Sequence, residues 1–370
     1  MVVLDISLDN FYAFKNFHMN MTYPKKIVGS SIKEEHLAER PNFRYKKVNI
    51  IMGANATGKT SLCRALMKIF NFITNKNYEM LVEAICDRTQ PASFVLDLAF
   101  KSNIFYRVHC VIAPCEGDSY TVESVKVEVR KTKILAKDSY ESCAKRISEM
   151  QYVPDGNYIE ELEKVEALAW MFEYPKDSGR MLKFPEKDPL FATVLEIILK
   201  ALDPSIQAVE PSRDVEKAYV IRLQDKSVIL QDGTESSTPL LSSGTKSGVE
   251  VAQVVSAMMQ GSNSFYYCDE KFTYVHSDIE MAILSLMIDY IQPNDQLFFT
   301  THNTEVLNMN LPKHSFTFLR KDMSDTEHPI TCVDASSMLK RNTDSLKNAV
   351  ENDLFSCAPS VDLIYAIADL

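Results

Sequence analysis

The chain has 370 residues, of which 46% are hydrophobic and 24% charged, so it can bury a sizeable core in one large domain or two modest ones. Its formal net charge is -10, with 40 lysines and arginines against 50 aspartates and glutamates, which disfavours unaided nonspecific binding to DNA. The eight cysteines show no paired CxxC spacing, and no segment has the pattern of a signal peptide or the length of a membrane span, so we expect a cytoplasmic protein with reduced thiols.

The first part of the chain predicts strands on both sides of a polar segment. Residues 2–21 indicate two strands around a short turn, and the charge-mixed residues 25–47 indicate a surface loop. Residues 48–52 are typical of a buried strand, and apolar residues between positions 62 and 73 recur at the spacing of one helix face. Residues 53–60 lie between them, so strand, glycine loop and helix follow in the order that a phosphate-binding loop requires.

The middle of the chain predicts an antiparallel sheet and then helices. Three alternating runs between residues 92 and 135 favour antiparallel strands. Helices are predicted near residues 158–172 and 190–202, within a proline-punctuated stretch that we interpret as a helical insertion over 141–204. Two short strands around a turn follow at 218–231.

The last third of the chain predicts helices and strands that alternate to the end. Helices are expected at 251–259 and 279–291, and buried strands at 264–268 and 296–300. This order predicts an α/β fold with a mainly parallel sheet flanked by helices, an antiparallel β subdomain and a helical insertion.

The segment "GANATGKT" matches the pattern GxxxxGK[ST] between a predicted strand and a predicted helix. We expect Lys59 to reach the β- and γ-phosphates of ATP, and the Thr60 hydroxyl to bind Mg²⁺. A chance match in a loop is the alternative, which the correct flanks and the scarcity of glycine, 10 in the chain, disfavour. The predicted nucleotide-binding residues here are Gly53, Ala54, Asn55, Ala56, Thr57, Gly58, Lys59, Thr60 and Ser61.

Two carboxylates, Asp269 and Glu270, end the apolar run "FYYCDE". Beside a phosphate loop, the first is expected to hold Mg²⁺ through water and the second to polarise the attacking water. The alternative is a solvated strand end. We favour the functional interpretation, because a parallel sheet places the carboxyl ends of its strands at one edge.

His302 follows the next predicted strand in "LFFTTHN". A lone histidine at a strand end is often a structural group. Because His302 comes one strand–helix–strand unit after Asp269, we expect it to sense the γ-phosphate.

Together these motifs resemble the ABC-type ATPase family: a phosphate loop with Asn55 as its third residue, a Ser-Gly segment that opens a helix, a strand ending Asp-Glu and a strand ending Thr-His-Asn. Within it the chain resembles the stand-alone bacterial branch of abortive-infection, anti-phage and overcoming-lysogenization-defect systems, itself similar to SMC and recombination-repair ATPases. "LDNFYAFKNFHM", "LSSGTKSG" and "DEKFTYVHSDIE" match that branch in order and spacing. The resemblance covers nearly the whole chain and implies one discontinuous ATPase head over 1–370, with its core at 1–140 and 205–370 and the insertion at 141–204.

The segment "LLSSGTKSG", residues 240–248, has the composition of a linker. The resemblance instead implies a signature motif that completes the ATP site of a second subunit. Ser242 and Gly244, with Ser243 between them, would then face the partner's γ-phosphate, and a helix from Lys246 would supply N–H dipoles.

The chain departs from the family in several ways. Thr245 stands where transporters usually have glutamine, and His276 matches a position near the dimer seam, with a surface histidine as its alternative. The glutamine that many relatives use to sense Mg²⁺ is not assigned, and Gln151 is a candidate only. The insertion is too short for the coiled-coil arms of SMC proteins. The sequence after His302 lacks the acidic cluster that would indicate an appended nuclease domain.

The resemblance therefore implies an ATP- and Mg²⁺-dependent ATPase that works as a homodimer with ATP between its subunits. We expect no membrane association, and a role as the regulatory subunit of an anti-phage system with a separate toxin or nuclease effector. One alternative is an SMC-like DNA repair or maintenance ATPase, which the acidic charge disfavours. A second is a scaffold that binds ATP without hydrolysing it.

Overall fold

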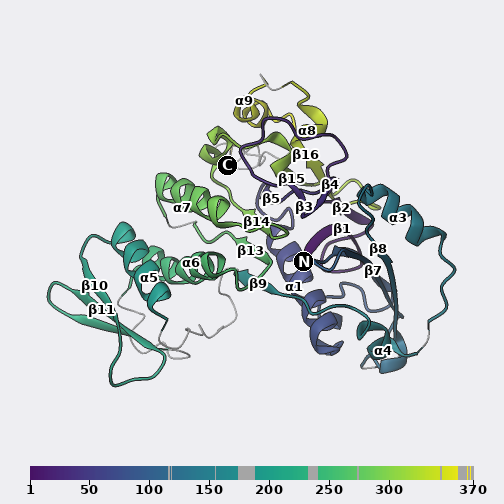
Figure 1. Cartoon of the computed structure of the whole chain (residues 1–370), viewed down its shortest axis with the longest axis horizontal. Coiled ribbons are helices and arrows are strands. Elements are labelled where there is room, and N and C mark those ends of the chain that lie inside the picture. Colours follow the sequence, from purple (N-terminus) through teal and green to yellow (C-terminus); the bar gives the residue numbers. More distant parts are fainter. Residues whose placement is uncertain are drawn as a thin grey trace. The chain divides into compact units, whose positions relative to one another are not determined.

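The structure is a computed structural model, and the chain divides into two compact units (Figure 1). Unit 1 comprises Met1–Ala169 and Pro293–Leu370, and unit 2 comprises Trp170–Gln292. The residues that the structure describes are 1–115, 117, 119–154, 156–173, 188–231, 241–272, 275–341, 344–356, 365 and 367. The segment predicted to be an insertion, 141–204, is divided between the two units.

Unit 1 contains a five-stranded antiparallel sheet with the strand order β2-β1-β6-β7-β8. Its strands are β1 (Val2–Asp9), β2 (Phe17–Asn20), β6 (Ala92–Ala99), β7 (Ile104–Ile112) and β8 (Val125–Lys133). Apolar residues pair across it, as where Val108 lies opposite Val129. The antiparallel strands predicted for residues 92–135 are confirmed, and the two N-terminal strands extend the same sheet.

Unit 1 also contains parallel strands. β5 (Val48–Met52) pairs with β14 (Gln296–Thr300) on one side and with β15 (Phe316–Lys321) on the other. Every residue of β5 and β14 is buried, which explains their mainly apolar sequences. β16 (Ile330–Asp334) runs antiparallel to β15, so the predicted alternation of helix and strand to the end of the chain is wrong here. The reason is that the chain returns through a loop without an intervening helix.

Helix α1 (Lys59–Asn75) follows the glycine loop after β5, as predicted. The ring centroid of Phe72 lies 6.3 Å from that of Phe94 in β6 and 5.7 Å from that of Tyr158, so the helix packs against the antiparallel sheet. Unit 1 also contains, among the described residues, the helical elements α2 (Glu79–Val82), η1 (Val122–Ser124), α3 (Tyr140–Glu149), α4 (Tyr158–Leu162), η3 (Thr304–Asn308), η4 (Lys313–Ser315), α8 (Ala335–Met338) and α9 (Leu346–Glu351).

The segment predicted as a surface loop, 25–47, is only partly one. It contains the paired strands β3 (His36–Leu37) and β4 (Arg40–Arg44). Leu37 and Phe43 are buried with residues of β1, β7 and α3 in one hydrophobic cluster. Strands this short carry too few residues for an alternating pattern, so the charge-mixed sequence concealed them.

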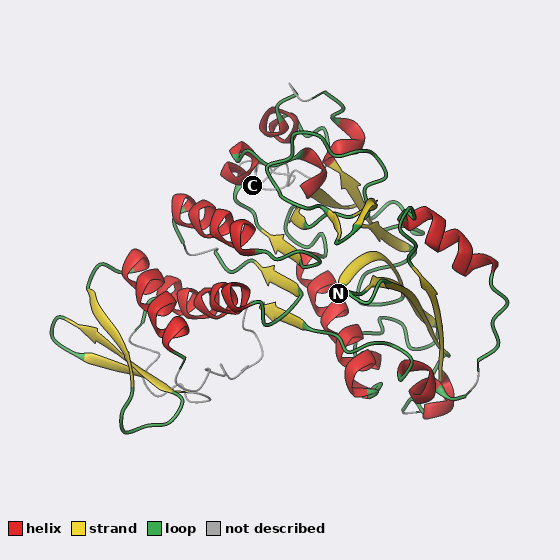
Figure 2. Cartoon of the chain, in the orientation of Figure 1, coloured by secondary structure: helices red, strands yellow, loops and turns green. Residues whose placement is uncertain are grey.

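Unit 2 contains three longer helices, which are α5 (Pro189–Leu202), α6 (Ser243–Gln260) and α7 (Ser277–Tyr290). Figure 2 shows α5 beside an antiparallel sheet of three strands, β10 (Ile206–Pro211), β11 (Ala218–Leu223) and β12 (Ser227–Gln231). Two further strands, β9 (Trp170–Glu173) and β13 (Phe265–Asp269), pair in parallel. The predicted helices, the buried strand and the strand pair of this unit are confirmed, whereas β10 was not predicted.

The helix predicted for residues 158–172 is correct only over α4, because residues 170–173 form β9 instead. The ring centroid of Phe172 lies 5.6 Å from that of Phe265 and 5.7 Å from that of Tyr267, both in β13. Aromatic residues fit a half-buried pleated surface, so contacts with β13 override the weak helical spacing.

Helices α5 and α6 pack closely at Gly248. A Cβ atom at this position would lie 2.4 Å from Leu202 Cδ1 and 3.0 Å from Leu199 Cδ2. The close approach explains why a glycine occurs inside a helix, where it costs about 1 kcal/mol relative to alanine. Among the described residues, every helix is too short or too polar to cross a bilayer.

Candidate functional site

The glycine loop of unit 1 has three backbone positions with positive φ. Gly53 follows β5 with a φ of 156°, Ala56 has a φ of 62°, and Gly58 caps α1 with a φ of 102°. Positive φ is expensive for residues with a Cβ atom, which is why glycine occurs at both ends of this turn. The loop therefore curls sharply between strand and helix, as a phosphate-binding loop does.

Packing also requires the two glycines. A Cβ atom on Gly53 would lie 2.5 Å from the carbonyl oxygen of Leu319 and 2.7 Å from Oγ1 of Thr57. A Cβ atom on Gly58 would lie 3.2 Å from the ring of Phe14 and 3.2 Å from Cδ1 of Ile330. The loop is thus held by β15, β16 and the N-terminal segment that contains "LDNFYAF".

The ammonium group of Lys59 lies inside the curl of the loop. The side chain is 3% exposed, and Nζ donates hydrogen bonds to the carbonyl oxygens of Gly53 (2.9 Å) and Ala54 (3.1 Å). The hydroxyl of Thr57 donates to the same Ala54 oxygen at 2.9 Å. A positive charge fixed at the N-terminus of a helix suits a phosphate group.

The end of β14 lies beside the end of β5 in unit 1. Thr300 is paired with Ile51, and the backbone N–H of Thr301 donates to the Ile51 carbonyl at 3.3 Å. His302 comes next and is exposed. His302 therefore follows a strand that neighbours the phosphate-loop strand, and its predicted role as a sensor of the γ-phosphate stays a prediction.

Asp269 and Glu270 lie at the carboxyl end of β13 in unit 2, as predicted. Asp269 is fully buried, and Glu270 is half-buried with a φ of 47°. Their predicted meeting with the phosphate loop stays a prediction, because they belong to unit 2 and the loop belongs to unit 1. Burial raises the pKa of the neighbouring Cys268 thiol far above its ordinary value, so this cysteine stays a neutral thiol.

A third carboxylate at this edge of unit 2 was missed from the sequence. Glu173 ends β9, is 2% exposed and is paired with Cys268 of β13. The signal that could have found it is the aromatic run "AWMFEYP", in which a proline follows shortly after a glutamate. The helix predicted over residues 158–172 obscured that signal.

Helix α6 is tied to the Asp-Glu turn by a buried ion pair. Nζ of Lys271 donates to a carboxylate oxygen of Glu250, and the two residues are 5% and 7% exposed. A buried charge pair of this kind holds its elements firmly, because breaking it leaves an uncompensated charge. The segment that opens α6 and the Asp-Glu turn are therefore linked within unit 2.

The segment "LLSSGTKSG" forms the start of α6, except for Leu240, which lies outside the described residues. Ser242 is the N-cap, and its Oγ accepts from the Thr245 backbone N–H at 3.1 Å and lies 2.7 Å from Thr245 Oγ1. The helix starts at Ser243, so the sequence prediction of a start at Lys246 is corrected by one turn. The cause is that Ser242 caps the helix, so residues 243–245 form the first helical turn instead of a loop.

His276 and Gln151, the two other residues singled out in the sequence, are both exposed. His276 is exposed and caps α7, with its side chain accepting from the Asp278 backbone N–H at 3.3 Å. Gln151 is exposed in the loop between α3 and α4 of unit 1. Capping accounts for His276 without a partner subunit, and its position at a dimer seam stays a prediction.

We expect Gly53→Ala to lower the free energy of unfolding by about 1–3 kcal/mol, because the new methyl group overlaps the Leu319 carbonyl. The measurement is the midpoint of urea unfolding at an unchanged m-value. Ala56→Gly is the matched control in the same loop, and it should unfold no earlier than the original protein, since glycine tolerates a φ of 62°. Equal midpoints for Gly53→Ala and the original chain would contradict the prediction.

The structure is similar to solved SMC head domains. An SMC head bound to the C-winged helix domain of ScpA matches with a TM-score of 0.54 and 10% identity, over 92% of this chain and 100% of that chain. An SMC head with an extended coiled coil, bound to the C-terminal domain of ScpA derived from Pyrococcus furiosus, matches with a TM-score of 0.50 and 10% identity, over 91% and 98%. No protein-family model and no curated protein matches the sequence. The predicted fold class, the mixed α/β fold of SMC and ABC-type ATPase heads, is confirmed.

Proposed function

We propose that the chain binds and hydrolyses ATP as an ABC-type ATPase. The observation that carries the proposal is the loop between β5 and α1, where Lys59 is held inside a glycine-terminated turn at a helix N-terminus. The same loop pattern lies within a fold similar to SMC heads. Backbone N–H groups and the lysine would together hold the β- and γ-phosphates.

Mg²⁺ is the metal that this chemistry implies, and the residues fit it. The Thr60 hydroxyl and the Asp269 carboxylate are oxygen donors, the kind that Mg²⁺ prefers. Mg²⁺ is usually held by one or two protein ligands together with phosphates and water. When bound, Mg²⁺ would neutralise charge on the phosphates.

Glu270 is proposed as the residue that activates the attacking water. Its left-handed backbone, with a φ of 47°, is unusual for glutamate and costs free energy that the surrounding fold must offset. The support for this role is the place of Glu270 directly after the carboxyl end of the buried strand β13. His302, exposed at the end of β14, would sense the γ-phosphate.

We propose that two copies of the chain enclose ATP, with Ser242, Ser243 and Gly244 of one subunit completing the site of the other. Ser242 and Ser243 are exposed at the N-terminus of an 18-residue helix, where backbone N–H groups favour an anion. Ser242 Oγ accepts from the Thr245 backbone N–H and lies 2.7 Å from Thr245 Oγ1, a pair in which either hydroxyl can donate. When the Thr245 hydroxyl donates, the Ser242 proton is available to a phosphate oxygen.

The test of ATPase function is Lys59→Ala. This change removes the only cation that the motif directs at the phosphates, so nucleotide binding and turnover should both be lost. Fluorescent-nucleotide titration and phosphate release measure the two effects, and circular dichroism confirms that the variant is folded. Unchanged affinity and turnover would overturn the assignment of the loop.

For the biological role, we propose a regulatory ATPase of an anti-phage defence system that acts on a separate toxin or nuclease. The support is the sequence resemblance in "LDNFYAFKNFHM", "LSSGTKSG" and "DEKFTYVHSDIE". Activation of a co-expressed neighbouring toxin or nuclease by the wild type, but not by Lys59→Ala, tests it.

An SMC-like maintenance ATPase is the second candidate, and the similarity to SMC heads favours it. Stimulation of ATP hydrolysis by duplex DNA at physiological salt would decide for this candidate. A scaffold that binds ATP without turnover is the third, and measurable hydrolysis that is lost in Glu270→Gln would exclude it.

A further inference from the structure

A cavity of about 500 Å³ lies in unit 1, outside the phosphate loop. Three segments line it, residues 23–31, 310–314 and 336–340. Its volume is within the range of sites for small molecules, about 300–1,000 Å³. Neither the fold nor the proposed ATPase chemistry requires a cavity here.

The cavity lies at the sheet edge opposite to the phosphate loop. That loop follows the carboxyl end of β5, whereas Lys313 and His314 immediately precede the amino end of β15, which is parallel to β5. Ser336 follows β16, which runs antiparallel to β15. The carboxyl end of β16 therefore lies at the same edge as the amino end of β15, and Ser336 lies at the edge where His314 lies. A strand of five residues separates the two edges by roughly 16 Å, so this is a separate site.

The lining of the cavity is strongly basic. Of the described residues that line it, four are lysines and none is an aspartate or glutamate, although the chain as a whole carries a net charge of -10. Lys25, Lys26 and Lys340 make no hydrogen bond or ion pair with any residue that the structure describes. Lys313 donates to the Arg341 carbonyl and lies 3.9 Å from Asp344 Oδ2. Three of the four lysines thus carry positive charge that no ion pair with a described residue compensates.

The floor of the cavity is fixed by buried polar contacts. Nε2 of His314 lies 2.6 Å from Oε1 of Glu35, and the residues are 5% and 3% exposed. Oε2 of Glu35 accepts from the Ser30 hydroxyl at 2.6 Å, and the Tyr23 ring centroid lies 4.5 Å from that of His314. Nδ1 of His314 has no hydrogen-bond partner among the described residues.

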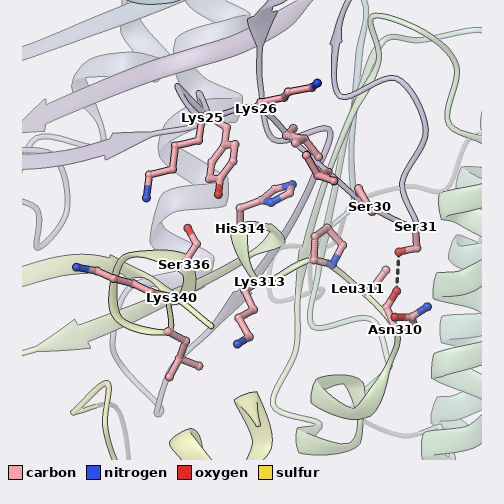
Figure 3. A pocket seen from close by; sticks show the side chains of 16 residues that line it. Lys25, Lys26, Ser30, Ser31, Asn310, Leu311, Lys313, His314, Ser336 and Lys340 are labelled. Atoms are coloured by element: carbon pink, nitrogen blue, oxygen red, sulfur yellow. Dashed lines mark hydrogen bonds between the residues drawn. The ribbon is translucent and has the colours of Figure 1, made fainter. Parts of the chain in front are cut away.

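Figure 3 shows His314 at the centre of the labelled side chains, with Lys25 and Lys26 on one side and Lys313 and Lys340 on the other. Burial, together with the charge of Glu35, raises the pKa of Tyr23, which therefore keeps its hydroxyl proton. The cavity thus offers a histidine, a phenol and serine hydroxyls between its lysines.

We propose that this cavity binds a small molecule that carries two or more phosphate groups. Lysine ammonium groups bind phosphate as point charges, and several around one hollow match a ligand with several negative charges. A compact ligand meets mainly the basic lining, whereas a long nucleic acid would also meet the acidic surface of the rest of the chain. The site is independent of ATP hydrolysis and stands whether or not the loop of unit 1 is catalytic.

The test is isothermal titration of the full chain with inorganic tripolyphosphate in a Lys59→Ala background, which removes the phosphate loop as a binding site. One tripolyphosphate per chain should bind. Adding Lys25→Glu and Lys340→Glu should weaken this binding at least about tenfold, because two attractions become repulsions. Both lysines are exposed, so the variant should remain folded, as circular dichroism will show.

Lys126→Glu together with Lys137→Glu is the matched control, since these lysines are also exposed but lie outside the cavity. The control should bind tripolyphosphate as the Lys59→Ala chain does. Absence of binding in the Lys59→Ala chain, or equal binding in the cavity and control variants, overturns the proposal. Labelled single-stranded and duplex DNA form the second arm, and DNA binding that needs Lys25 and Lys340 while tripolyphosphate does not bind would overturn it in favour of a nucleic-acid site.

Discussion

Glu270→Gln should bind ATP, hydrolyse it about 10²–10³ times more slowly than the original chain, and accumulate as an ATP-bound dimer. Glutamine preserves the shape of the side chain and tolerates the same backbone, including the φ of 47° that this position requires. It cannot accept a proton from water, so the chemical step fails while the phosphates remain held. Single-turnover kinetics and light scattering with and without ATP measure the two effects.

Glu173 provides the sharpest comparison, because it is a second carboxylate at the same edge of unit 2. Glu173→Gln should retain turnover if Glu270 is the residue that activates water. The opposite result, with Glu173→Gln inactive and Glu270→Gln active, would move the role to β9. No ATP-dependent increase in mass for Glu270→Gln would contradict the dimeric switch.

The phosphate loop could be predicted from sequence because all its determinants are local. A buried strand, two glycines, Lys59 and an amphipathic helix follow one another within residues 48–75, and the structure places them as expected. The ends of β13 and β14 could be predicted from sequence in the same way, since each strand is a short apolar run that ends in polar residues. Local pattern thus identified each strand end.

The rest depends on contacts between distant segments. β9 forms because Phe172 packs against β13, which lies more than ninety residues further along the chain. The buried pair of Glu35 and His314 unites two segments 279 residues apart, and neither residue alone has a pattern that predicts the other. The basic cavity is hidden for the same reason, since its lysines come from three separate segments.

The start of α6 combines a feature that local sequence determines with one that depends on contacts to another helix. The N-cap at Ser242 is a local feature that the preference of serine for this position could have predicted, although the expected helix start was Lys246. Gly248 was grouped with a signature motif, yet its environment shows a packing role against Leu199 and Leu202 of α5. The packing role of Gly248 makes Gly244 the glycine of "LLSSGTKSG" to test for a part in a composite site.

Gly244→Glu should abolish hydrolysis while leaving ATP binding at the variant's own phosphate loop. Gly244 lies in the first turn of α6, where a glutamate is compatible with the helix and favoured by its dipole, so folding should survive. In the proposed dimer the new carboxylate would stand where the partner's γ-phosphate must approach, and like charges at that distance repel strongly. Gly244→Ala is the matched control and should retain most activity.

Mixing Gly244→Glu subunits with Lys59→Ala subunits separates a composite site from a site within one chain. Each variant alone should be inactive. Random pairing makes about half of the dimers mixed, and each mixed dimer has one site with both lesions and one intact site, so about a quarter of the original rate should return. A mixture that stays inactive, together with undiminished ATP-driven dimerisation of Gly244→Glu, would show that residues 240–248 only begin a helix and do not complete the partner's ATP site.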